Sequence, residues 1–573
     1  MTELQLDNVA SAQTYTLANG QSASVANMAN GETVDFAGDT VTALDLTVNG
    51  LGTQAGGGVT IDLNSTAQTD LNLTTAAAAS HVLLQNSAAG TPLVNTSVAG
   101  DQNVTVDADI NNVTLKTVDA SAATGDVTVR VDDDNAEDVT VTGGSGDDTV
   151  DFGAELTQDD VLDGGEGTDT LEVTQASVTA VQGLNATDKA TLNENLSNVE
   201  VVEVSDGLTS DIDASRFDSI NNYVLAGGLS NGGTSTLSSV ASGVSVEIGA
   251  AVNDVLAVDI TDATKAGNNS DVVNLVLNDN AAGGSSDLGV VNLVGVDELN
   301  IDAQQLDSGT TTGYVLDIAN TSTALDKVTV TGNTAVDLSG VNLVDSISEV
   351  DASGMTLDAT DNGLTAAIAT GGSNGVKITG SDGVDDLTGG DAADVIDAGA
   401  GNDTITGGAG NDELTGGAGS DTFTFAATAA GNGADTITDF TGGAVADGGD
   451  VLDFGAFLAD AGTTVNANNL SLTSGSSNIT LNDDNVYQIT LNSDIASKDF
   501  GAGDFAELFG AANGQFNTTT NAAGDTAVVM VQGDDTTQIY AVNAGADNTV
   551  AAGEVELIGT ADVTGDLGAA NFA

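Results

Sequence analysis

Five consecutive nonapeptides between Gly380 and Thr424 carry the residues of this chain that are best suited to chemistry. They read GSDGVDDLT, GGDAADVID, AGAGNDTIT, GGAGNDELT and GGAGSDTFT. Their sixth position is always aspartate, at Asp385, Asp394, Asp403, Asp412 and Asp421. Their eighth position is always apolar, at Leu387, Ile396, Ile405, Leu414 and Phe423. Carboxylates repeated in phase indicate a site for a hard cation, because such ions prefer oxygen ligands.

The glycines of these nonapeptides indicate a second set of oxygen ligands. Because glycine has no Cβ atom, a Gly-rich turn of six residues can point its backbone carbonyl groups inward. The candidate carbonyl donors are Gly399, Gly401, Gly408, Gly410, Gly417 and Gly419. Calcium takes six to eight oxygens at about 2.3–2.6 Å, which carbonyl and carboxylate groups can supply together. The other three residues of each nonapeptide should form a short strand whose apolar side chain fills a thin core.

The pattern GGxGxDxUx resembles the calcium-binding nonapeptide of RTX (repeats-in-toxin) proteins, whose repeats form a parallel β-roll. The resemblance implies that two nonapeptides make one coil, so each Asp faces the Asp of the next repeat but one. It implies three calcium sites, between Asp385 and Asp403, between Asp394 and Asp412, and between Asp403 and Asp421. The sequence departs from the pattern at Ser381, Ala392 and Ala393, so the Asp394 site is the least regular. The competing interpretation is an acidic, Gly-rich linker.

A second, split copy of the motif lies upstream. GGSGDDTVD (143–151) and GGEGTDTLE (164–172) match the pattern completely, with Asp148 and Asp169 at the sixth position. Twelve residues, FGAELTQDDVLD (152–163), separate the two copies. We expect them to form one partial calcium clamp at a domain junction.

The segment after the last repeat predicts an end cap for the roll. Residues 423–443 and 448–457 resemble the strand pair that often follows RTX repeats, and an uncapped roll would expose a sheet edge. Four aspartates there could bind another calcium ion or only solvate the cap: Asp435, Asp439, Asp450 and Asp453. Capping is the favoured role, and Asp439 and Asp450 are kept as further candidate calcium ligands.

Period-two alternation of apolar and polar residues predicts that the chain is almost all β. Segments such as VTALDLTV (41–48) and DVTVRVD (126–132) have the pattern of half-buried strands. Helical candidates are limited to 186–196 and 498–513. An Asp-Ala pair also recurs after strands, in TVDASA (117–122), DIDASRF (211–217), NIDAQQL (300–306) and EVDASGM (349–355). Either stacked β rungs or a shared Asp- and Ala-rich composition would produce this recurrence.

The predicted fold class is all-β, with β-rich sandwich or solenoid domains and a calcium-binding parallel β-roll. The expected organisation has five parts. They are an N-terminal β domain (1–140), the split RTX clamp (141–175), a central β-rich domain (176–379), the β-roll (380–424), and a cap, assembly region and C-terminal secretion signal (425–573).

Composition excludes several classes of function. The chain has 573 residues, with 85 acidic against 8 basic ones, and a formal net charge of −77. Nucleic acid is a polyanion and rewards clustered Lys and Arg, which this chain lacks. Without Cys, and with His81 alone, the chain cannot build a thiolate nucleophile, a zinc finger or a multi-histidine metal site. We therefore expect no enzymatic activity, and we expect His81 to be a structural or surface residue and not a metal ligand.

The N-terminal sequence MTELQLDNVASAQ has neither the basic nor the apolar region of a secretory signal peptide. No stretch approaches the roughly 18 apolar residues of a membrane-spanning helix, so no membrane insertion is expected. The RTX resemblance implies export through a type I secretion channel with an uncleaved C-terminal signal. The expected location is the outside of the cell, where millimolar calcium would let the repeats fold.

The remaining sequence favours a structural protein among the RTX classes. A pore-forming toxin, a zinc protease or a lipase would each need elements that are not visible here. The β-rich, acidic composition resembles the surface-layer (S-layer) proteins of Gram-negative bacteria, which implies calcium-dependent self-assembly on the cell. By that resemblance, residues 1–140 would hold cell-surface polysaccharide and residues 380–573 would assemble. The alternatives are an RTX adhesin or biofilm-matrix filament, and a secreted hydrolase that uses paired carboxylates.

Overall fold

The structure is a computed structural model of the chain, and it divides into two compact units, Met1–Thr264 and Lys265–Ala573. In the first unit it describes residues 3–8, 13–17, 21–37, 42–53, 57–63, 69–85, 95–108, 115–131, 138–218, 220–230, 232–249 and 255–260. In the second unit it describes residues 271–278, 286–304, 313–320, 325–339, 346–368, 374–456, 458, 466–472, 478–481, 485–491, 517–520, 526–532, 536–543, 555–565, 567 and 569–572.

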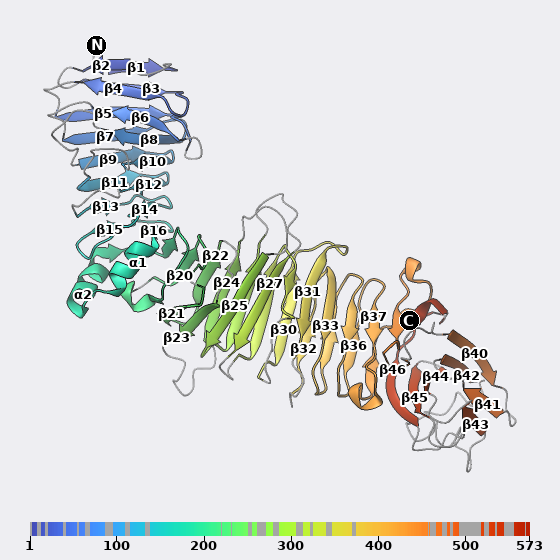
Figure 1. The fold of residues 1–573 in the computed structure, drawn as a ribbon. Helices are drawn as coiled ribbons and strands as arrows, with labels where there is room; N and C mark the ends of the chain where they lie inside the picture. The colour runs from blue at the N-terminus through green and yellow to red at the C-terminus, as the bar shows by residue number, and fades with distance from the viewer. Residues whose placement is uncertain are drawn as a thin grey trace. The chain divides into compact units, whose positions relative to one another are not determined.

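In the described part of the first unit, most strands pair in parallel with the next strand but one, so that successive strands alternate between facing sheets (Figure 1). One sheet contains β1 (Glu3–Asp7), β3 (Ser22–Ala26), β5 (Ala43–Asn49), β7 (Asp70–Thr75), β9 (Asn95–Gly100), β11 (Thr117–Ala123), β13 (Thr140–Thr142), β15 (Val161–Asp163) and β17 (Leu196–Ser197). The facing sheet contains β2 (Gln13–Thr16), β4 (Thr33–Ala37), β6 (Val59–Asp62), β8 (Ser80–Gln85), β10 (Val104–Asp107), β12 (Val127–Arg130), β14 (Thr149–Asp151), β16 (Thr170–Val173), β18 (Val201–Val204), β20 (Asn222–Leu225) and β22 (Val244–Ile248). A third row is formed by β19 (Ile212–Asp213), β21 (Thr234–Val240) and β23 (Val255–Ile260).

Two short helices, α1 (Gln175–Gln182) and α2 (Ala186–Asn195), lie between β16 and β17, and a 3-10 turn follows at Ala214–Arg216. The α2 helix begins where the Asn185 side chain accepts hydrogen bonds from the backbone of Thr187 and Asp188. This cap satisfies N–H groups that have no partner inside a helix. The helix predicted at 186–196 is therefore confirmed, whereas the candidate at 498–513 lies outside the described residues.

The second unit uses the same alternation over most of its length. One sheet contains β24 (Val272–Leu277), β26 (Glu298–Ala303), β28 (Lys327–Gly332), β30 (Glu349–Met355), β32 (Lys377–Thr379), β34 (Val395–Asp397), β36 (Glu413–Thr415) and β38 (Asp435–Ile437). The facing sheet contains β25 (Ser286–Val294), β27 (Tyr314–Asn320), β29 (Val336–Asp337), β31 (Asn362–Ala367), β33 (Val384–Thr388), β35 (Thr404–Thr406), β37 (Thr422–Thr424) and β39 (Val451–Asp453). Short 3-10 turns lie at Ala429–Gly431 and Val445–Asp447.

The end of the second unit departs from this pattern. The strands β40 (Asn466–Leu472), β42 (Asn485–Leu491) and β44 (Thr526–Gln532) pair in parallel, as do β41 (Asn478–Leu481) and β43 (Asn517–Thr520). The strands β45 (Thr537–Asn543) and β46 (Val555–Ala561) continue antiparallel, and β46 then pairs in parallel with β38. A last 3-10 turn lies at Ala569–Asn571. The segment after the repeats thus returns to the final coil of the roll.

The core of each unit is a thin layer between the facing sheets. In the first unit Val129, Val150, Leu171 and Val202 stand in register on four successive strands, and all are buried. Period-two alternation produces this column, because every second side chain of a strand points to the same face. The parallel stacking is that of a solenoid, so the sandwich alternative for residues 1–140 and 176–379 does not describe this fold.

The recurring Asp-Ala pairs have a local structural cause at three of their four positions. Asp119, Asp213 and Asp351 each accept hydrogen bonds from both the backbone N–H and the hydroxyl of the Ser two residues later. At Asp213 this Asx turn ends the strand, whereas at Asp119 and Asp351 the strand continues beyond the turn with a shift in register. At the fourth position Asp302 instead accepts from the side chain of Gln304. Stacked rungs, more than composition, explain the recurrence.

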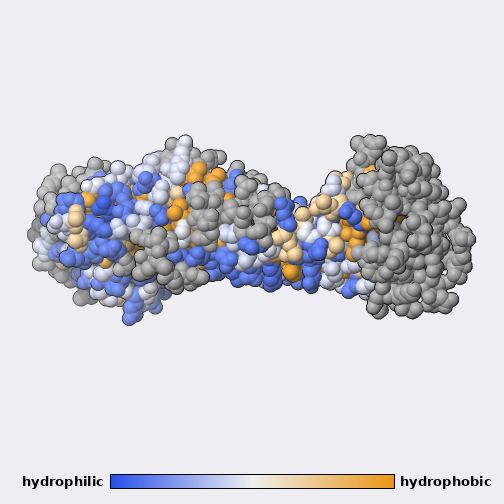
Figure 2. Space-filling view, turned by 90° about the horizontal axis from the view of Figure 1, so that it is seen from below, coloured by the Kyte–Doolittle hydropathy of each residue, from blue (hydrophilic) through white to orange (hydrophobic). Residues whose placement is uncertain are grey.

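Charged side chains also form columns along the sheets. Arg130 lies 3.8 Å from both Asp107 and Asp151, its register neighbours on the adjacent strands. His81 is buried, with Nε2 3.5 Å from Asp107 Oδ2. Hydrophilic residues cover much of the described surface on the face shown in Figure 2, and hydrophobic residues form small separate patches. No helix in the described part of the chain is long and apolar enough to cross a bilayer.

Candidate calcium centre

The aspartates at the sixth position of the nonapeptides form a ladder along the roll. The backbone N–H of Asp385 donates to Oδ1 of Asp403 at 2.8 Å, and that of Asp403 donates to Oδ1 of Asp421 at 3.0 Å. On the other side of the roll, the N–H of Asp394 donates to Oδ1 of Asp412 at 2.8 Å. Each bond spans 18 residues, the length of two nonapeptides. The structure thus brings together all three aspartate pairs that the sequence predicted.

Short strands and a narrow core hold this ladder. The apolar residues at the eighth position lie on β33 to β37, and all five are buried: Leu387, Ile396, Ile405, Leu414 and Phe423. Phe423 also packs against Phe440, with ring centroids 6.1 Å apart. Each coil contributes few atoms to this core. The polar groups of the turns must therefore find hydrogen-bond partners within the turns or bind a metal ion.

The predicted glycine turns have an unusual backbone. Left-handed φ angles occur at the second and fourth positions of three turns: Gly399 (+105°), Gly401 (+142°), Gly408 (+95°), Gly410 (+136°), Gly417 (+91°) and Gly419 (+150°). Glycine adopts such angles without the steric cost that a Cβ atom brings. Close approach adds a second requirement, since a Cβ atom at Gly419 would lie 1.5 Å from the Gly401 carbonyl oxygen.

The first position of a turn forms an oxygen-lined space. A Cβ atom at Gly380 would lie 2.2 Å from the Ala398 carbonyl oxygen and 2.7 Å from Asp385 Oδ2. At Gly389, the corresponding neighbours are the carbonyl oxygen of Gly407 at 2.1 Å and Asp394 Oδ2 at 2.5 Å. In these two turns a carboxylate oxygen faces the first carbonyl group of the next coil, but an N–H group of the same turn also holds that oxygen. In the Asp169 turn, a Cβ atom at Gly164 would likewise meet the Asn198 carbonyl oxygen and Asp169 Oδ2. There the carboxylate oxygen has no hydrogen-bond partner, so the pair is left for a cation such as calcium.

Three carboxylate oxygens in these turns are buried without a hydrogen-bond partner. They are Oδ2 of Asp169, Oδ2 of Asp403 and Oδ2 of Asp412, on residues that are 2 %, 1 % and 2 % exposed. A buried charged oxygen without a partner is costly, so each requires a proton or a cation. The oxygen-only donor set fits calcium, with Asp169, Asp403 and Asp412 and nearby backbone carbonyls as the residues that would hold it.

The pKa values of the ladder aspartates also indicate that these carboxylates need a proton or a cation. Burial raises the pKa of Asp403 to about 7, and the charges of Asp385 and Asp421 add to the shift. Burial likewise raises the pKa of Asp412 and of Asp421 to about 6, and that of Asp435 to about 8. Without a cation, these carboxylates therefore favour their protonated form at a pH where free aspartate is charged.

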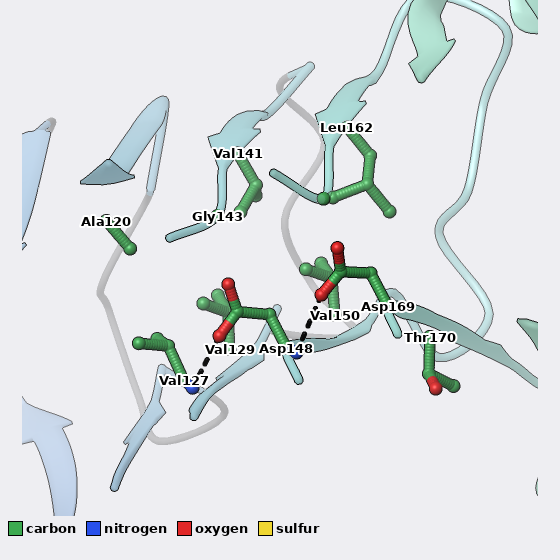
Figure 3. A pocket seen from close by; sticks show the side chains of 11 residues that line it. Ala120, Val127, Val129, Val141, Gly143, Asp148, Val150, Leu162, Asp169 and Thr170 are labelled. Carbon is green, nitrogen blue, oxygen red and sulfur yellow. Dashed lines mark hydrogen bonds between the residues drawn. The ribbon is translucent and has the colours of Figure 1, made fainter. Parts of the chain in front are cut away.

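The upstream copies form a second ladder. The N–H of Val127 donates to Oδ1 of Asp148, and the N–H of Asp148 donates to Oδ1 of Asp169, both at 2.7 Å. Figure 3 shows the two carboxylates side by side in an interior pocket, each with its second oxygen directed toward the space near Val141 and Leu162. Burial raises the pKa of Asp169 to about 6. The two copies thus stack as neighbouring turns of one ladder, and the calcium clamp expected from the sequence stays a prediction.

Sequence reasoning missed two carboxylates near this ladder: Glu200, which continues it, and Asp160, which lies on the opposite side of the solenoid. Asp160, within the 12-residue spacer, accepts from the N–H groups of Val139 and Thr157 at 2.7 Å, and it is buried. Its segment, DDVLD, matches the Asp and the apolar residue in the second half of the motif but lacks the glycines of the first half. This partial match could have identified Asp160 from the sequence. Glu200 accepts from the N–H of Asp169 at 2.9 Å, where the pattern would place an aspartate.

The carboxylates of the candidate ligands beyond the repeats already accept hydrogen bonds from backbone N–H groups. Asp439 accepts from Gly416 and Gly417, and Asp450 accepts from Asp421 and Thr441. Asp435 accepts from Asp412 at 3.1 Å and so extends the ladder by one coil. Asp453 accepts from Gly455 in a local turn. Among the described residues, no place gathers three or more Asp, Glu or His side chains around a metal-sized space, so carbonyl oxygens must supply most ligands.

This geometry defines a calcium-binding parallel β-roll in two runs of turns, the first at 143–172 and the second at 380–424. Three segments of the chain, 133–155, 156–172 and 388–423, match the family described as the RTX calcium-binding nonapeptide repeat. The matched segments contain Asp148, Asp160 and Asp169 upstream and Asp394, Asp403, Asp412 and Asp421 downstream. Asp385 lies outside them. RTX repeats of this kind bind Ca²⁺. No curated protein matches the chain.

Proposed function

We propose that this chain is a secreted structural protein that self-assembles in a calcium-dependent way into a surface layer on the bacterial cell. The observation that carries the proposal is the aspartate ladder, with buried carboxylate oxygens at Asp169, Asp403 and Asp412 that have no partner in the protein. A fold with this defect depends on calcium, because binding free energy becomes folding free energy.

Calcium dependence supports export. In calcium-poor cytosol, the clustered carboxylates of the RTX runs repel one another and disfavour the folded turns. Outside the cell, millimolar calcium matches the roughly 10⁻⁴–10⁻³ M affinity typical of extracellular modules. We propose type I secretion as the route, since proteins with RTX repeats are generally secreted.

Net charge supports calcium as a bridge between subunits. Two surfaces of a chain with a formal charge of −77 repel each other at short range. Monovalent salt screens this repulsion, whereas a divalent ion can also bind carboxylates from both surfaces. In this proposal the partners are further copies of the chain, and neither nucleic acid nor membrane insertion has a part.

The proposal assigns different tasks to the two ends. Residues 1–140 would hold cell-surface polysaccharide, and residues 380–573, which include the longer RTX run, would make the lattice. The solenoid offers long polar side-chain ladders for such contacts. In one of them, Asn72 donates to Asp45 at 2.7 Å, and Ser97 donates to Asn72 at 2.8 Å.

The test is assembly of the purified full chain. It would be prepared in chelator, given millimolar calcium or the same concentration of magnesium, and imaged by negative-stain electron microscopy. Two-dimensional sheets with calcium only are the expected product. Fibres would favour the alternative, an RTX adhesin or biofilm-matrix filament. A chain that stays monomeric in calcium, and folds equally well without it, would reject the proposal.

A further inference from the structure

The hydrogen bonds of the two ladders divide the RTX turns into two kinds. In the first kind, the N–H at the second position donates to the carboxylate of the same turn. These bonds join Gly144 to Asp148 at 2.6 Å, Ser381 to Asp385 at 2.7 Å and Gly390 to Asp394 at 2.6 Å, in each case at Oδ2. We call these turns closed.

Both oxygens of each closed carboxylate are satisfied by the protein itself. The Oδ1 atoms accept from the preceding coil, where the donors are the N–H groups of Val127, Leu364 and Val376. The Ser381 hydroxyl adds a further bond to Asp385 at 2.9 Å. Burial raises the pKa of all three carboxylates, and the hydrogen bonds from these donors lower it again in part. The donors therefore satisfy both oxygens of each carboxylate without a metal.

In the second kind, which we call open, the Oδ2 atom has no such donor. The open turns are those of Asp169, Asp403 and Asp412, whose Oδ2 atoms are buried and unpartnered. Their second and fourth residues are glycines with left-handed φ, for example Gly165 at +105° and Gly167 at +130° in the Asp169 turn. Closed turns lack this pair of angles, since neither Gly144 nor Gly146 is left-handed.

The sequence supplies a reason for closure in the second run. Ser381 occupies the second position of the first turn, and Ala392 occupies the fourth position of the next. Side chains with a Cβ atom disfavour the left-handed angles of the open turns. In the first run the reason is the neighbouring coil, because Asp147 of the closed turn donates to Asp126, which lies before the motif.

We propose that each RTX run begins with turns that need no metal, in which Asp148, Asp385 and Asp394 act as hydrogen-bond caps on the metal-free solenoid. Calcium enters only the later turns, beginning with those of Asp169, Asp403 and Asp412. The closed turns join each run to the coils before it, so that the junction stays folded when calcium is removed. Calcium loading is independent of the self-assembly proposed above.

The test compares two matched double variants of the full chain, D385N/D394N and D403N/D412N. Calcium bound per chain is measured by equilibrium dialysis against Ca²⁺ alone, and the melting temperature is measured with calcium and with chelator. The closed-turn variant should bind as much calcium as the unmodified chain and lose stability under both conditions. The open-turn variant should bind about two fewer ions and lose only the calcium-dependent part of its stability. Equal loss of calcium in the two variants would overturn the proposal.

A third variant, S381G/A392G, keeps the test decisive if the closed-turn variant does not fold. It restores the repeat pattern and makes left-handed angles accessible at both positions. It should bind more calcium than the unmodified chain, by up to two ions. An unchanged stoichiometry in this variant would show that side chains at these positions do not control loading, and would overturn the proposal.

Discussion

The backbone N–H of Asp385 lies 2.8 Å from Oδ1 of Asp403, although 18 residues separate them in the sequence. One carboxylate oxygen of each ladder aspartate therefore joins two coils of the roll. The other oxygen is left for a cation or for a donor in its own turn. Both tasks require an oxygen, so this position requires aspartate, because the amide of asparagine has only one oxygen.

Stability without calcium should fall as pH rises from about 5 to about 8. Folded-state pKa values of about 6 for Asp169 and about 7 for Asp403 lie above that of free aspartate. The folded chain therefore holds more protons than the unfolded chain in this range, and raising the pH favours unfolding. Calcium should weaken or reverse the trend, because it occupies the deprotonated carboxylates. Thermal melts at pH 5, 6.5 and 8, with calcium and with chelator, measure this; a chelated protein more stable at pH 8 than at pH 5 contradicts it.

Replacement of Gly419 by Ala should be far more damaging than replacement of Gly443. Both glycines have left-handed φ, at +150° and +128°. A Cβ atom at Gly419 meets the Gly401 carbonyl oxygen, whereas one at Gly443 has no atom within 4 Å. Gly443→Ala should cost about 1–2 kcal/mol of unfolding free energy from backbone strain alone. Gly419→Ala must also separate two coils, so a smaller loss than for Gly443→Ala in calcium would refute this account of the turn.

Asn571 should be essential for closing the end of the roll. Its side chain is fully buried and donates to the carbonyl groups of Gly443 and Asp450, at 2.8 and 2.7 Å. Next to it, Phe572 forms a parallel bridge with Leu452. Asn571→Ala leaves both carbonyls without this donor, which should cost about 1–3 kcal/mol for each. Chemical denaturation in calcium measures the loss, and Asn72→Ala, which removes an exposed bond to Asp45, serves as the mild control.

Arg130→Gln should destabilise the first unit, and more at pH 8 than at pH 5. The guanidinium group lies between Asp107 and Asp151. It also lowers the pKa of Glu172, which burial and the charges of Asp151 and Glu203 raise to about 7. Without Arg130, these acids repel one another when they are ionised. The control is Lys377→Gln, an exposed partner of Glu349 that should cost at most about 1 kcal/mol. Equal losses from Arg130→Gln at both pH values would argue against a charged column.

The repeated units were readable from sequence because their determinants lie within nine residues. Gly at fixed positions, Asp at the sixth and an apolar residue at the eighth define each turn and strand of the roll. The same holds for the strands elsewhere, where a buried column such as Val129, Val150 and Leu171 follows from alternation. The pairing of Asp385 with Asp403 could be predicted because the coil is two repeats long.

Contacts between coils of unequal length could not be predicted in this way. Asp412 reaches Asp435 across 23 residues, and Asp421 reaches Asp450 across 29. Asp160 was overlooked because its turn has no glycines, although it joins two coils as the ladder aspartates do, on the opposite side of the solenoid. The predicted candidates Asp439 and Asp450 receive backbone N–H groups from other turns, which no local pattern indicates.

Sequence alone therefore determined the all-β class, the RTX turns and their demand for calcium, since these depend on spacing within a coil. The tertiary structure decided that the β-rich regions are solenoids, and it decided which turns are closed. Asp148 illustrates the difference, because its nonapeptide matches the repeat completely, yet Gly144 donates to its carboxylate. For Asp148, whether the carboxylate meets an N–H group or a cation is set by the coil stacked against its turn, about 20 residues away in the chain. For Asp385 and Asp394, the residues Ser381 and Ala392 within the turns contribute to that choice.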